Sequence, residues 1–140
     1  MKTILLLLIL FPLTGAAING ILGRYLPRRL VEIIACGALL CSLFMAATAV
    51  IKTGGESYNF VLFEWFRAGD LSVDMNIHYD ALAAIMTLMV TFVAGIIHLY
   101  SVSFMRDDPD FVRYFCYLNL FTFSMLAIAL ADSLVFVYLG

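Results

Sequence analysis

Charged side chains are scarce in this sequence and absent from four long stretches. Only 13% of the 140 residues are Lys, Arg, Asp or Glu, whereas a soluble domain usually carries about a quarter. None occurs in residues 3–23, 33–51, 81–105 or 114–131. A helix needs roughly 20 apolar residues to cross a bilayer, and each stretch is about that long. The pattern predicts an integral membrane protein with four spanning helices.

Cysteine is also rare, and a basic stripe is lacking. The three cysteines, Cys36, Cys41 and Cys116, show no metal-ligand spacing, so we interpret them as small buried hydrophobic residues. No heme, zinc or iron–sulfur site is predicted. A formal charge of -2 without a basic stripe excludes a nucleic-acid partner. The sequence contains no nucleotide-binding loop and no nucleophile triad, and it predicts no catalytic residue.

The charge gaps and the turn residues define the expected elements. The first apolar run resembles a signal peptide in its first residues, but it stays apolar to Gly23 and ends at a basic loop, so we interpret it as a retained helix. Two runs around the turn at residues 67–70 suit a hairpin, and the second alternates between apolar and polar residues. An open sheet edge cannot face lipid, so this hairpin is expected outside the hydrocarbon. We expect a single membrane segment, all-α, with helices at about 4–23, 30–51, 81–104 and 111–131, an incomplete helix at 133–140, and an extramembrane β-hairpin at about 60–79.

The fifth apolar run is too short to cross a membrane, since it holds only residues 133–140. We therefore expect the chain to be the front part of something longer, through a split gene or a shortened sequence, with a true short protein as the alternative. The positive residues predict the orientation. The loops between the first two and the last two spans carry Arg24, Arg28, Arg29, Arg106 and Arg113, and the other side carries Lys2, Lys52 and Arg67. The positive-inside rule then places the N-terminus and the hairpin on the outer, periplasmic side.

Few residues inside the spans can carry chemistry. His98 is a candidate for a proton path because its charge can change near neutral pH, and the alternative is a histidine bonded to a neighbouring helix. Asn119 can hydrate a polar path or link two helices by a hydrogen bond. Asp80 and Asp132 precede apolar runs and are expected to be structural helix caps, and Asp110 is a further candidate cap. No metal site is predicted.

Several motifs, taken together, resemble a known family. They are IHLYS at 97–101, FMRD at 104–107, YFCYLNLF at 114–121 and LADSL at 130–134. This combination is similar to the largest antiporter-like membrane subunit of respiratory complex I, called L in bacteria and chain 5 in mitochondria. The resemblance covers essentially the whole chain, and it is most specific from His98 onwards.

The resemblance implies proton translocation coupled to quinone reduction by NADH in a bacterial inner membrane or an equivalent membrane. The family's glutamate on helix five would follow Gly140, and its later lysines lie further on, so neither is placed on a residue here. His98, Asp80 and Asp132 match polar positions of the family; the first is expected to shape a half-channel. NADH, FMN, iron–sulfur clusters and quinone are expected on other subunits. The implied partners are the other membrane subunits of complex I and the lipid bilayer.

Two alternatives remain open at this point. One is the large subunit of a multisubunit cation/proton antiporter, or a subunit of a membrane-bound hydrogenase, since these are homologous to the complex I subunit. The other is a small stand-alone membrane protein that acts as a scaffold or assembly factor. Neighbouring genes would separate the first alternative from complex I, and the DNA after codon 140 would test the second.

Overall fold

A computed structural model describes residues 1–132 and 134–139. The elements follow the order α1 (Lys2–Leu22), α2 (Arg28–Thr53), β1 (Tyr58–Ala68), β2 (Leu71–Tyr79), α3 (Ala81–Phe104), α4 (Phe111–Leu130) and α5 (Leu134–Leu139). The first four helices are long and apolar enough to cross a membrane. The predicted fold class, four spanning helices with a hairpin between the second and third, is confirmed. The expected helix ends lie close to the observed ones.

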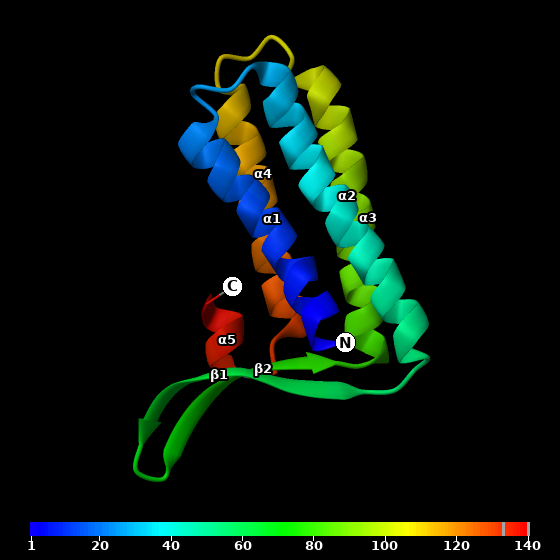
Figure 1. Cartoon of the computed structure of the whole chain (residues 1–140), viewed down its shortest axis with the longest axis vertical. Helices are drawn as coiled ribbons and strands as arrows, with labels where there is room; N and C mark the ends of the chain where they lie inside the picture. Colours follow the sequence, from blue (N-terminus) through cyan, green and yellow to red (C-terminus); the bar gives the residue numbers. More distant parts are fainter. Residues whose placement is uncertain (133, 140) are drawn as a thin grey trace.

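The four long helices run side by side, and α1 contacts both α2 and α4 while α3 contacts α2 and α4 (Figure 1). The α1–α2 and α3–α4 loops lie together at one end of the bundle, and the N-terminus and the hairpin lie at the other (Figure 1). Arg28 of α2 donates to the backbone carbonyl of Arg106 and so joins the two loops. The arginine-rich loops therefore form one end of the molecule, as their charge pattern predicts.

Helix α3 buries its small and polar residues and exposes its large apolar ones. Its buried residues are Ala83, Ala84, Thr87, Thr91, Gly95, His98 and Ser101. Large side chains such as Leu82, Phe92 and Leu99 are more than half exposed. This distribution is the reverse of a water-soluble helix, and it suits hydrocarbon, where small residues allow helices to approach closely.

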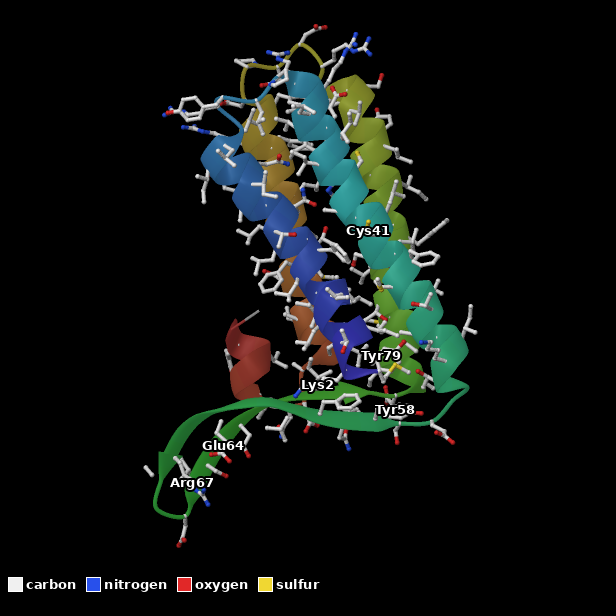
Figure 2. All side chains as sticks on the ribbon, in the orientation of Figure 1. Lys2, Cys41, Tyr58, Glu64, Arg67 and Tyr79 are labelled. Carbon is white, nitrogen blue, oxygen red and sulfur yellow. The ribbon has the colours of Figure 1, made fainter. Side chains whose placement is uncertain are left out.

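The hairpin crosses the end of the bundle and its tip projects beyond α5, with Arg67 near the tip (Figures 1 and 2). Its strands pair antiparallel from Tyr58–Tyr79 to Ala68–Leu71, with two register shifts in β1. Gly69 has φ +61°, a conformation that glycine adopts without strain. The apolar face predicted for β2 is buried at Ile77 and Tyr79 and exposed at Leu71, because only the inner half of the strand reaches the bundle.

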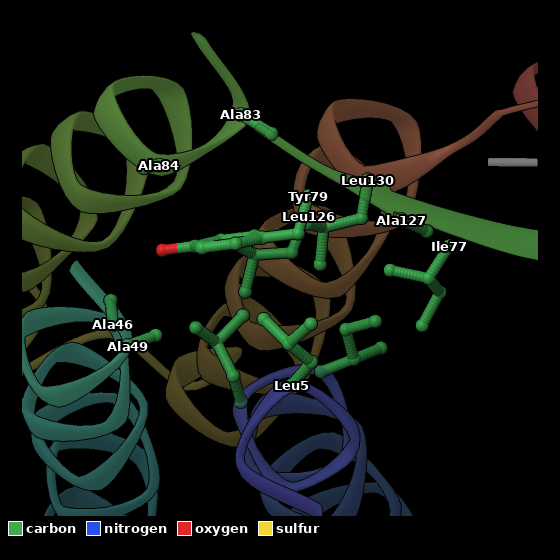
Figure 3. Packing of buried hydrophobic residues seen from close by; sticks show 12 residues of the cluster. Leu5, Ala46, Ala49, Ile77, Tyr79, Ala83, Ala84, Leu126, Ala127 and Leu130 are labelled. Carbon is green, nitrogen blue, oxygen red and sulfur yellow. The ribbon is translucent and has the colours of Figure 1, made fainter. Parts of the chain in front are cut away.

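The inner half of the hairpin closes an apolar core (Figure 3). Ile77 and Tyr79 of β2 pack against Leu5 of α1, Ala49 of α2 and Leu126 of α4 in one cluster. The hydroxyl of Tyr79 is buried without a hydrogen-bond partner among the described residues. Thr53 and Thr87 approach it but lie outside hydrogen-bond geometry. The ammonium group of Lys2 donates to the carbonyl of Val61 over 3.3 Å, which fastens α1 to β1 (Figure 2).

Backbone contacts also connect β2 to the segment after α4. Ile77 forms an antiparallel bridge with Ala131. The amide of Asp132 donates to the carbonyl of Asn76 over 3.3 Å. Helix α5 begins at Leu134, one residue after the start expected near Ser133, which lies outside the described residues, as does Gly140.

Candidate polar site between the membrane helices

His98 lies on the buried face of α3 with 1% of its surface exposed. Its Nδ1 atom is 2.8 Å from the carbonyl oxygen of Ala94, one turn earlier in the same helix. Its ring lies 6.0 Å from that of Phe115, measured between centroids. The imidazole is therefore held by its own helix on one side and faces α4 with the other.

Asn119 of α4 meets the free side of this ring. Its Oδ1 atom is 3.3 Å from Nε2 of His98, and its side chain is fully buried. The two candidates from the sequence thus belong to one site, although they lie 21 residues apart. Their roles in proton transfer stay a prediction, because the contact alone is also what a structural link between two helices requires.

The protonation of His98 determines which amide atom of Asn119 can serve as its partner. Nδ1 must carry a proton to donate to Ala94, so Nε2 of a neutral ring is an acceptor only. An acceptor needs the amide nitrogen of Asn119 opposite it, whereas a charged ring donates from Nε2 and needs the amide oxygen. In the present orientation the amide nitrogen of Asn119 has no hydrogen-bond partner among the residues that the structure describes. A half-turn of the amide therefore suits the site to either charge state, because the two amide ends differ little in shape.

A second polar contact lies one turn further along α3. The hydroxyls of Ser101 and Tyr114 are 2.8 Å apart and join α3 to α4. Sequence reasoning did not find this pair, because the register between two helices is not visible in either sequence alone. Ser101 and His98 lie on the same buried face, so the polar residues continue from the His98–Asn119 pair towards the arginine-rich end.

Helix α1 packs closely against the site. The thiol of Cys116 on α4 donates to the carbonyl of Ala16 over 3.3 Å. A Cβ atom built on Gly15 would lie 2.9 Å from the Cβ of Ala38 and 3.4 Å from the amide nitrogen of Asn119. The absence of a side chain at Gly15 is therefore what allows α1 to approach both α2 and Asn119.

Asn19 of α1 is a polar residue that the sequence analysis missed. Its side chain is fully buried, and within the part of the chain that the structure describes neither its amide nitrogen nor its amide oxygen has a hydrogen-bond partner. A buried amide without partners costs about 1–3 kcal/mol. Its sequence signal was an amide inside a span that contains no charge, which is the same signal that pointed to Asn119.

The aspartates differ in their positions relative to the helices. Asp80 caps α3, since its carboxylate accepts a hydrogen bond of 2.8 Å from the amide of Ala83. Asp110 precedes α4 but makes no side-chain cap bond; its own amide donates to the carboxylate of Asp108 instead, which corrects the expectation for Asp110. Asp132 is exposed, and its capping role stays a prediction because the expected first residue of α5, Ser133, lies outside the described residues.

Comparison with known proteins now tests the family resemblance. A family model described as NADH-Ubiquinone oxidoreductase (complex I), chain 5 N-terminus, matches residues 65–115. NADH-quinone oxidoreductase subunit L of Rickettsia bellii is 35% identical over 141 residues, which cover 99% of this chain and 22% of that protein. The chain matches the N-terminal portion of complex I subunit L. The resemblance inferred from the motifs is thereby confirmed.

Two relatives named chain 5 give the same result. NADH-ubiquinone oxidoreductase chain 5 of Dictyostelium discoideum is 34% identical over 138 residues, covering 94% of this chain and 20% of that protein. The chain 5 protein of Triticum aestivum is 30% identical over 137 residues, covering 96% and 20%. The chain therefore spans about a fifth of the length of these relatives. The two alignments cover 94% and 96% of this chain.

Proposed function

We propose that this chain forms the N-terminal helices of a proton-translocating, antiporter-like subunit of NADH:quinone oxidoreductase. The supporting observation is the buried contact between His98 and Asn119, which places a titratable ring between two membrane helices of a chain similar to subunit L. Ionisable residues inside membrane spans are costly and often mark proton or ion paths. In this proposal His98 holds and releases a proton at Nε2, and Asn119 stabilises whichever state is present.

We further propose the orientation and the division of labour within the complex. The arginine-rich end of the bundle faces the cytoplasm, or its equivalent, and the N-terminus and hairpin face the outer side, following the positive-inside rule. NADH, FMN, iron–sulfur clusters and quinone bind to other subunits. The partners of this chain are those subunits and the lipid bilayer, which suits four helices with large exposed apolar side chains.

Complex I is favoured over the two alternative functions by the comparisons. The relatives described above carry the name of an NADH-quinone or NADH-ubiquinone oxidoreductase subunit. The antiporter alternative predicts neighbouring genes for small antiporter subunits, and the scaffold alternative predicts normal proton pumping when His98 is replaced.

Replacing His98 tests the proton role directly. In the assembled complex, His98→Ala is expected to lower the number of protons pumped per electron while leaving the amount of assembled complex largely intact. Proton uptake in closed vesicles, electron transfer from NADH to quinone, and native gels of the membrane measure the three quantities. His78→Ala is the matched control, because His78 lies on β2 outside the spanning helices.

The outcomes separate the roles clearly. A normal proton-to-electron ratio in the His98→Ala complex would refute the proton role and leave His98 as a structural link. An equal loss of pumping in the His78→Ala complex would assign the effect to removal of any histidine from the chain. Rescue of pumping by His98→Lys, and no rescue by His98→Phe, would support a titratable group at this position over a packing role.

A further inference from the structure

A hollow of roughly 890 Å³ lies beside α1 and α4 at the arginine-rich end of the bundle. The end of α1, the α1–α2 loop and the first turns of α4 surround it. The described residues that line it include three arginines, Arg24, Arg28 and Arg113, and one acid, Asp110. The lining is therefore positively charged, which favours an anionic ligand.

Asn19 gives a second, independent indication of a ligand. It also lines the hollow, its side chain is fully buried, and neither end of its amide has a hydrogen-bond partner in residues 1–132 and 134–139, as far as these are described. An amide N–H can donate to a phosphate oxygen, so an anion in the hollow would supply the partner that the protein leaves out. Gly20 and Gly23 also line the hollow, and they let α1 pack closely against Cys116 and Val112 of α4 beside it.

The arginines are only partly engaged by the protein. Arg113 lies 4.0 Å from the carboxylate of Asp110, and both side chains are about 70% exposed, so this ion pair is weak. Arg28 donates to the carbonyl of Arg106 and lies 5.8 Å from the ring centroid of Phe111. A guanidinium carries five N–H donors, so most of the donors of Arg28 and Arg113 remain available.

The location of the hollow determines the source of the anion. It lies where spanning helices α1 and α4 meet the loops, which is the level of the lipid headgroups. Basic pockets between spanning helices bind anionic headgroups, and arginine binds phosphate in a bidentate manner. We propose that this hollow binds the phosphate of an anionic phospholipid, with Arg24 and Arg113 holding the charge and Asn19 donating from its amide.

Lipid selectivity of the full chain in vesicles tests the site. Spin-labelled phosphatidylglycerol and spin-labelled phosphatidylcholine are added separately to phosphatidylcholine vesicles, and the immobilised fraction of each is measured by electron paramagnetic resonance. Wild type is expected to prefer the glycerol lipid. In the double variant Arg24→Gln/Arg113→Gln, the preference for phosphatidylglycerol over phosphatidylcholine is expected to fall by a factor of about five for each arginine removed. Arg28 is left in place because it also packs against Phe111.

Two further variants separate a built site from general surface charge. Lys52→Gln/Arg67→Gln removes the same charge from the other end of the molecule and is expected to retain the preference. Asn19→Leu keeps the size and all charges and is expected to weaken the preference partly, with circular dichroism confirming an intact helix content. An unchanged preference in the Arg24/Arg113 variant, or an equal loss in the Lys52/Arg67 variant, would overturn the proposal.

Free phosphate distinguishes the two sources of the anion. Inorganic phosphate is added at an ionic strength matched with sodium chloride. A lipid site is expected to keep its immobilised phosphatidylglycerol, because the acyl chains hold the headgroup at the membrane. Release of the labelled lipid by phosphate and not by chloride would assign the hollow to a soluble anion and overturn the lipid assignment.

Discussion

The imidazole of His98 on α3 faces the amide of Asn119 on α4, with 3.3 Å between Nε2 and Oδ1. Both side chains are buried, so the contact is a buried polar link between α3 and α4, in addition to the Ser101–Tyr114 contact between the same helices. The interaction energy between His98 and Asn119 can therefore be measured as the coupling energy of the two residues.

A double-mutant cycle is expected to reveal this coupling. His98→Leu and Asn119→Leu each leave the other polar group buried without its partner, so the double variant is expected to lose less stability than the sum of the single variants. Interhelical hydrogen bonds in membranes contribute on the order of 0.6 kcal/mol. The free energy of unfolding in detergent micelles measures the cycle, and strictly additive losses would show that the two side chains do not interact.

Gly15→Ala is expected to destabilise the bundle. The added Cβ would lie 2.9 Å from the Cβ of Ala38, so α1 and α2 must separate. Overpacking of this kind costs about 1–3 kcal/mol. Gly37→Ala is the control, because a Cβ at Gly37 meets no described atom within 4 Å and alanine favours the helix. Thermal unfolding of the two variants makes the comparison, and equal midpoints would contradict the close approach at Gly15.

Tyr79 is expected to contribute through its ring and not through its hydroxyl. Burial raises the pKa of this hydroxyl, for which the described residues supply no hydrogen-bond partner. Tyr79→Phe removes a buried polar group without a partner, so stability is expected to stay the same or rise. Tyr79→Ala empties the site and is expected to cost about 3–5 kcal/mol, as for other large aromatic residues.

An exposed tyrosine provides the control for this series. Tyr25 is 86% exposed, so Tyr25→Ala is expected to leave the free energy of unfolding nearly unchanged. Chemical unfolding followed by circular dichroism compares the three variants. A clear loss of stability in Tyr79→Phe would show that the hydroxyl finds a partner in Thr53 or Thr87.

Acid is expected to weaken the start of α3. The amide of Ala83 donates to the carboxylate of Asp80 and holds the pKa of that group below its ordinary value, and the nearby ring of His78, 3.5 Å away, adds to the effect. A lowered pKa in the folded state means that the unfolded state binds more protons in this range. The charged carboxylate of Asp80 therefore contributes fully to the stability of the folded state above about pH 4, the ordinary pKa of an aspartate. This contribution is lost as the pH falls through the lower pKa of the folded state.

Asp80→Asn isolates this effect. Asparagine caps helices as well as aspartate but carries no charge. The unfolding temperature of the Asp80→Asn variant is therefore expected to depend less on pH than that of wild type. The range to compare runs from neutral pH to about pH 3, which is below the ordinary pKa of aspartate. Identical pH profiles for the two proteins would show that Asp80 does not contribute to the acid sensitivity.

The sequence predicts the membrane architecture because hydrocarbon imposes a simple rule. A charge within a span is costly, so the gaps between Lys2 and Arg24 or between Asp80 and Arg106 already mark helices α1 and α3. The hairpin is likewise visible, since β2 alternates and Gly69 supplies the turn. These features depend on residues near one another in the sequence.

The candidate site was predicted residue by residue but not as an assembly. His98 and Asn119 each carry a visible signal, whereas their contact depends on how α3 rotates and slides against α4. The same limit explains Asn19, whose burial depends on the approach of α1 to α4. It also explains the missing side-chain cap bond of Asp110 in the described residues, because such a bond depends on the conformation of the loop before α4. These contacts are determined by the packing between helices, which cannot be read from the sequence of one helix alone.

The bridge between Ile77 and Ala131, and the bond from the amide of Asp132 to the carbonyl of Asn76, join the hairpin to the end of α4 through main-chain atoms. Replacing side chains leaves these contacts in place. A neighbouring protein that bound the projecting tip would therefore be connected to the end of α4 through the backbone of β2.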